Sequence, residues 1–148
     1  MDGMDLFFTQ KKENEKPSDS KLWGGVGVKC IDWSPTESNM LAAVTLKTGK
    51  LEIWDVEKGM MEAIYETRGE FKQLKWSLHE SDILVGFGDQ FFFEIDCLTG
   101  KNKVYPLDMT VTAMTQHPKR ADKFFFAGTL TGKVFLYDLQ QDKKIAQY

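Results

Sequence analysis

The chain has 148 residues, a length typical of one domain, and it is 42% hydrophobic and 28% charged. Its 19 basic and 22 acidic residues leave a formal net charge of −3, which argues against a bulk electrostatic grip on nucleic acid. No window approaches the roughly 18 consecutive apolar residues that a membrane-spanning helix needs.

The first 25 residues differ in composition from the rest of the chain. Residues 1–9 contain the apolar and aromatic stretch MDLFFT and predict one isolated strand that could close a larger sheet. Residues 10–25 are polar and charged and contain Pro17, which favours a flexible linker.

From Val26 onward, short runs rich in β-branched and aromatic residues alternate with turns that contain Gly, Pro, Asn, Asp or Ser. No long segment has the periodicity of a helix, so the sequence predicts an all-β protein. The predicted strands are VKCIDW (28–33), MLAAVTL (40–46), KLEIWDV (50–56), FKQLKW (71–76), DILVGF (82–87), FFFEID (91–96), VTAMT (111–115), KFFFAGTL (123–130) and KVFLYDL (133–139).

Three segments, 32–59, 75–100 and 115–142, repeat one pattern at an interval near 41 residues. Two positions mark the repeat, and they are occupied by Trp33, Trp76 and Gln116 and by Asp55, Asp96 and Asp138. A further strand is expected after each repeat, near 60–65, 102–106 and 143–148. A four-stranded unit of roughly 40–45 residues is typical of a β-propeller blade.

The stretch CIDWSP, followed by LAAVTLKTGKLEIWD, resembles the WD-repeat family, and the resemblance covers residues 26–148. It implies a partial β-propeller of about three four-stranded antiparallel blades, at 26–66, 69–107 and 109–148. The second and third repeats are degenerate and end in Ile-Asp and Tyr-Asp in place of Trp-Asp. Since propellers typically have about 4–8 blades, we expect a piece of a larger propeller, or one completed by a partner or by self-association.

Glu94 interrupts the apolar pattern of the middle repeat, because Ile53 and Leu136 occupy the same position in the other two. A buried carboxylate without a partner is costly. We expect a β-bulge that turns Glu94 outward. The alternative is that Glu94 has a partner.

No constellation for catalysis emerges from the repeats. The repeated aspartates follow the blade spacing, and His117-Pro118 matches Ser34-Pro35, so both sets are interpreted as turn formers. No Gly-rich phosphate loop is present, and two cysteines with two histidines lack zinc-ligand spacing. We therefore predict a protein that is not an enzyme and has no catalytic, cofactor or metal site. The two widely spaced cysteines favour a reduced, intracellular chain, either cytoplasmic or nuclear.

The family resemblance implies protein binding on the face formed by the d–a and b–c loops of the blades. The residues that these loops offer as contacts are Lys47, Arg68, Glu70 and Asp89. The predicted function is a non-catalytic scaffold or adaptor within an intracellular complex, whose partners are other protein subunits. The alternative is a nucleic-acid- or phospholipid-associated module, for which HPKR (117–120) is the main basic cluster.

Overall fold

The computed structural model describes residues 27–148 except 47–48, 67–69, 79 and 121–123. Twelve strands and no helix occur in this part of the chain, so it has no helix able to span a membrane. The predicted closing strand at 1–9 and the predicted linker at 10–25 lie outside the described residues.

The strands form three four-stranded antiparallel sheets, each a meander in chain order. The first blade contains β1 (Val28–Trp33), β2 (Met40–Thr45), β3 (Leu51–Asp55) and β4 (Met60–Tyr65). The second contains β5 (Gln73–Trp76), β6 (Ile83–Phe87), β7 (Phe91–Asp96) and β8 (Asn102–Pro106). The third contains β9 (Val111–Gln116), β10 (Phe124–Thr129), β11 (Val134–Asp138) and β12 (Lys143–Gln147).

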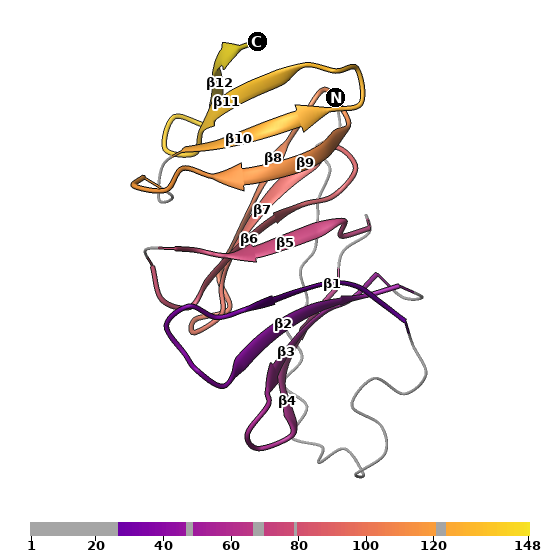
Figure 1. Cartoon of the computed structure of the whole chain (residues 1–148), viewed down its shortest axis with the longest axis vertical. Helices are drawn as coiled ribbons and strands as arrows, with labels where there is room; N and C mark the ends of the chain where they lie inside the picture. Colours follow the sequence, from indigo (N-terminus) through magenta and orange to yellow (C-terminus); the bar gives the residue numbers. More distant parts are fainter. Residues whose placement is uncertain (1–26, 47–48, 67–69, 79, 121–123) are drawn as a thin grey trace.

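The blades stack in chain order, with β1–β4 at the bottom of Figure 1 and β9–β12 at the top. Contacts between sheets involve their first strands, because β5 lies beside β1 and β2, and β9 lies beside β6. The prediction of an all-β partial propeller with three four-stranded blades is therefore confirmed.

Two apolar cores join the blades, and β7 contributes to both. Phe91, Phe93 and Ile95 point toward the first blade, whereas Phe92 points toward the third, as the two-residue period of a strand requires. The first core includes Leu51 of β3. A strand that is apolar on both faces, such as FFFEID, is what a blade between two others needs.

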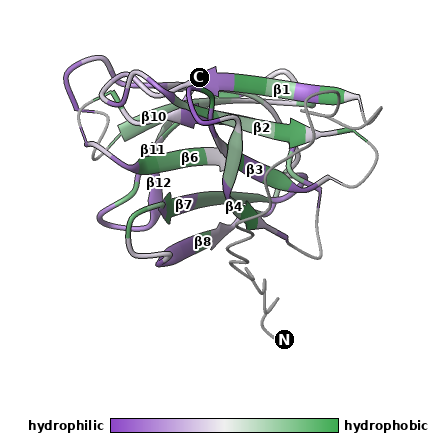
Figure 2. Cartoon of the chain, turned by 90° about the horizontal axis from the view of Figure 1, so that it is seen from below, coloured by the Kyte–Doolittle hydropathy of each residue, from purple (hydrophilic) through white to green (hydrophobic). Residues whose placement is uncertain are grey.

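The outermost strands β8 and β12 are hydrophilic, in contrast to the strands between them and the centre (Figure 2). Exposed lysines occupy the first positions of β12, and Asn102 and Lys103 begin β8. Charged residues on an edge strand discourage pairing with another sheet.

The bulge predicted at Glu94 is wrong. The pairing of β7 with β6 and β8 runs in unbroken register through Glu94, which lies opposite Val85 and Lys103. In the first blade, by contrast, the pairing of β3 with β4 has a register shift at Ile53/Trp54. Glu94 is half-buried in place, where burial raises the pKa of its carboxyl and Glu80 adds to the rise, while the charge of Lys103 opposes it. The cross-strand Lys103 supports the alternative that Glu94 has a partner.

The aspartate at the end of each third strand closes the following turn. Asp55 Oδ1 accepts the backbone N–H of Lys58 at 3.0 Å, Asp96 Oδ1 accepts that of Thr99 at 2.9 Å, and Asp138 Oδ1 accepts that of Gln141 at 3.0 Å. The interpretation of these repeated aspartates as turn formers is confirmed. In the first blade Asn39 Nδ2 also donates to Asp55 Oδ2 at 2.9 Å.

We expect Asp55→Asn to lower the free energy of unfolding by about 1 kcal/mol near pH 6, because the ionised carboxylate is the stronger acceptor. Bonds from the side chain and then the backbone of Lys58 lower the pKa of Asp55 below its usual value. A lowered folded-state pKa gives stability that is present above about pH 4 and is lost as the pH falls through the folded-state value. Urea denaturation of both proteins at pH 6 and pH 3 checks this, and a difference that stays constant over that interval would contradict it.

Candidate functional site

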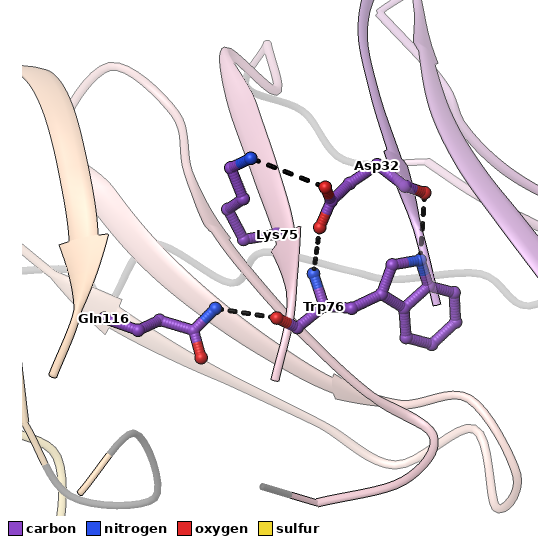
Figure 3. A network of polar contacts seen from close by, with 4 residues as sticks. All are labelled: Asp32, Lys75, Trp76 and Gln116. Carbon is purple, nitrogen blue, oxygen red and sulfur yellow. Dashed lines mark hydrogen bonds and ion pairs between the residues drawn. The ribbon is translucent and has the colours of Figure 1, made fainter. Parts of the chain in front are cut away.

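The ends of the three innermost strands are joined by hydrogen bonds that cross from blade to blade (Figure 3). Asp32 of β1 accepts the backbone N–H of Trp76 through Oδ2 at 2.7 Å, and its backbone oxygen accepts Trp76 Nε1 at 3.0 Å. Lys75 Nζ lies 3.4 Å from Asp32 Oδ1. Two bonds to one residue fix the second blade against the first.

The third blade continues the same connection. Gln116 Nε2 donates to the backbone oxygen of Trp76 at 2.7 Å, and Gln116 Oε1 accepts the backbone N–H of Leu78 at 3.3 Å. Trp76 and Gln116 occupy equivalent repeat positions, so the second and third blades use the same point of their first strands to bond the preceding blade. The repeat alignment found these positions, but it carried no signal that they bond between blades.

These residues line an open hollow of about 290 Å³ that spans all three blades. Trp33 and Leu78 border it with about half of each side chain exposed, and Met114 and Thr115 extend it onto the third blade. The indole of Trp33 is held in place because Nε1 donates to the backbone oxygen of Ser38 at 3.0 Å. A fixed, exposed aromatic beside a hollow can hold an apolar side chain of a protein partner.

The turns beside the hollow are capped alike in each blade. Ser34 Oγ accepts the backbone N–H of Glu37 at 3.0 Å, and Ser77 Oγ accepts that of Glu80 at 3.2 Å. In the third blade His117 Nδ1 accepts the backbone N–H of Arg120 at 3.1 Å. His117 is therefore a turn-capping residue, as its alignment with Ser34 predicted.

Of the four predicted contact residues, Lys47 and Arg68 lie outside the described residues. The structure places the backbone of Glu70 next to Gly88, which directly precedes Asp89. A methyl group at Gly88 would lie 2.7 Å from the backbone oxygen of Glu70. Lys29 Nζ lies 3.4 Å from Glu70 Oε2, and Lys72 forms an ion pair with Asp89.

The two surfaces lie at opposite ends of the innermost strands. Glu70 contacts Lys29 near the start of β1, whereas Asp32 and Trp33 are the last residues of that strand. The loop prediction therefore selected one end of the propeller, and sequence reasoning did not identify the hollow at the other. The described residues contain no cluster of three His, Cys, Asp or Glu that could hold a metal ion.

We expect Asp32→Ala to lower the free energy of unfolding by about 2 kcal/mol, because it removes a charged acceptor and leaves the Trp76 N–H without it. The matched control is Lys75→Ala, which removes only the long, half-exposed ion pair and should cost less than about 0.5 kcal/mol. Urea denaturation of both variants checks the difference, and equal losses would contradict the structural role of the Asp32–Trp76 bonds.

Three comparisons with known proteins bear on this architecture. No protein-family model matches the sequence, and no curated protein matches it. Among solved structures, the chain is similar to the β-propeller domain of Cps50 (Swd1) from Myceliophteria thermophila, with a TM-score of 0.69 and 14% identity. The match covers 82% of this chain and 41% of that one.

The described residues thus form three blades of the β-propeller class. The chain spans less than half of the propeller chain that it matches. At 14% identity, the likeness extends to the fold alone.

Proposed function

We propose that this chain is a non-catalytic WD-repeat scaffold that mediates protein–protein interaction within an intracellular complex. The observation that carries the proposal is the surface formed by Glu70 and Asp89 at one end of the second blade, where Glu70 reaches Lys29 of the first blade. Each carboxylate is paired with a lysine on a strand or next to one, so the loop positions are held by the rigid sheet. Binding residues in β proteins are commonly placed on loops that a rigid scaffold positions.

Membership of the WD-repeat family is part of the proposal. Its support is the structural role of the Trp-Asp pair in β3: the Trp54 side chain is 6% exposed and Asp55 closes the next turn. Placement inside the cell is supported by the two cysteines, which are unpaired. Burial raises the pKa of the Cys97 thiol to about 12, which keeps it protonated and unreactive.

Affinity capture from cell lysate tests the proposal. We expect co-purified proteins to be retained after nuclease treatment and in detergent, because their contacts are with the protein surface. Loss of every partner on nuclease treatment would favour the nucleic-acid alternative. Binding of the chain to phospholipid vesicles, with no protein partner retained, would favour the lipid alternative. Either result would overturn the scaffold role.

The double substitution Glu70→Lys/Asp89→Lys tests whether the Glu70/Asp89 surface is the binding site. We expect it to weaken capture of the retained proteins at least about tenfold, because like charges then face partner groups that had matched two carboxylates. Glu57→Lys is the control, since Glu57 is exposed in the β3–β4 turn at the other end of the blade. Equal capture by both variants would exclude the Glu70/Asp89 surface as the binding site.

A further inference from the structure

The first strands of the three blades allow an internal comparison of covered and uncovered positions. Ile31, Leu74 and Met114 occupy the same repeat position in β1, β5 and β9, each two residues before the repeated Trp or Gln. The Leu74 and Met114 side chains are 1% and 9% exposed, because a preceding blade covers each. Ile31, in the first blade, is 58% exposed.

The repeated tryptophan follows the same rule. Trp76 is 3% exposed and donates its Nε1 to the backbone oxygen of Asp32 in the preceding blade. Trp33 is 50% exposed and donates instead to Ser38, within its own blade. Leu41 pairs with Trp33 in register and lies on the same side of the sheet. We call Ile31, Trp33 and Leu41 the leading face.

The opposite side of the third blade shows the complementary pattern. Leu51, Phe92 and Val134 occupy one repeat position in β3, β7 and β11. The first two are covered by a following blade and are 0% and 1% exposed, whereas Val134 is 41% exposed.

Two further apolar residues share this side of the third blade. Leu136 lies two residues beyond Val134 along β11, and Phe126 pairs with Leu136 in register. Both side chains are only partly buried. We call Phe126, Val134 and Leu136 the trailing face.

We propose that the leading face of one copy of this chain packs on the trailing face of a second copy. The two faces are the halves of the junction that already joins β5 to the first blade and β9 to the second, so the contact would continue an interface present twice in the chain. Neighbouring exposed apolar residues on one sheet face commonly mark a site of association. A second copy is the proposed partner because one chain carries both the leading and the trailing face.

Head-to-tail association of this kind generates a closed ring when the rotation between copies closes, and a filament when it does not. Two copies of three blades give six, which is within the range of about 4–8 blades that propellers use. The Trp33 indole would then exchange Ser38 for an acceptor on the second copy. The repeat position of Asp32 is Thr115 in the third blade, and its backbone oxygen is the equivalent acceptor.

The test is the native mass of the full 148-residue chain, measured by light scattering over a range of micromolar concentrations. We expect a mass twice the 17.0 kDa of one chain. A monomer throughout that range would overturn the proposal. This measurement needs no variant, so it decides the question even if a substitution impairs folding.

Two charge substitutions then separate head-to-tail packing from other contacts. Ile31→Asp on the leading face and Val134→Asp on the trailing face should each weaken association more than about a hundredfold, because each would bury an unpaired charge. Leu98→Asp is the control, since Leu98 is 77% exposed in the β7–β8 turn and belongs to neither face. Circular dichroism of each variant verifies that it remains folded.

Mixing the two variants is the decisive step. The Ile31→Asp chain keeps a trailing face and the Val134→Asp chain keeps a leading face, so an equimolar mixture should form a heterodimer that neither variant forms alone. Loss of association with Ile31→Asp only would indicate two leading faces packed on each other and would overturn head-to-tail packing. Association that survives both substitutions would place the contact elsewhere and would overturn the proposal as well.

Discussion

Replacement of Phe92 by alanine is expected to lower the free energy of unfolding by about 4 kcal/mol, within the range for phenylalanine truncation in cores. The Phe92 side chain is 1% exposed and reaches from the second blade into the third. Its ring centroid lies 4.0 Å from that of Phe125 and 5.7 Å from that of Tyr137, in edge-on arrangements. The loss therefore combines lost burial, an unfilled cavity and the aromatic contacts that hold the third blade.

Urea denaturation measures this loss, and Phe92→Leu should recover most of it because leucine refills much of the cavity. Leu98→Ala is the control for an exposed apolar side chain and should change stability by less than about 0.5 kcal/mol. A loss below about 1 kcal/mol for Phe92→Ala would mean that the second and third blades are not held together by this core.

Gly86→Ala is expected to lower the free energy of unfolding by about 3 kcal/mol, the cost of overpacking a dense core. A methyl group at Gly86 would lie 2.3 Å from the backbone oxygen of Gln73 and 2.3 Å from Cζ of Phe93. The Phe93 ring has little freedom to move, because Phe71 packs against it edge-on at 4.8 Å between centroids. Either the β5–β6 pairing or the first core must shift.

Gly128→Ala provides the matched control in the third blade. Its methyl group would meet the nearest atom at 3.8 Å, an ordinary contact, so stability should stay within about 0.5 kcal/mol of the wild type or rise slightly. Thermal denaturation followed by circular dichroism compares the two variants. Equal stability of Gly86→Ala and Gly128→Ala would contradict the close packing of Phe93 on β6.

The strands and blades could be predicted because the patterns that encode them are local in the sequence. Strand length, alternation and turn chemistry are encoded within a few residues, so KLEIWD and KVFLYD predicted β3 and β11 from their own residues alone. The spacing of Asp55, Asp96 and Asp138 predicted both three blades and a turn role for each aspartate. Their hydrogen bonds to the next turn are local, which is why sequence spacing revealed them.

Contacts between blades were not predictable in the same way. A β-bulge was expected to turn Glu94 outward, but the strand is regular and Glu94 lies opposite Lys103, a pairing that depends on the register of β8. The need for glycine at position 86 was not predictable either. Ala43 and Ala127 occupy the same repeat position in the other two blades, so the repeat pattern tolerates a methyl group there. Only the placement of Phe93 and Phe71 makes a methyl group too large at Gly86.

Of the two candidate surfaces, one was predicted from the sequence and the other was not. Loop positions of the blade pattern singled out Glu70 and Asp89, and the tertiary structure places the backbone of Glu70 next to Gly88, the residue before Asp89. The hollow beside Trp33 has no sequence signal, since it is built from residues about 40 positions apart.

By itself the sequence determined an all-β chain with three repeats, because hydrophobic alternation and turn formers act over short distances. The tertiary structure alone decided which copy of each repeated residue is covered. Trp33 and Trp76 have the same local sequence role, yet one is half exposed and the other buried. Burial depends on whether a neighbouring blade is present, and that neighbour lies a whole repeat away along the chain.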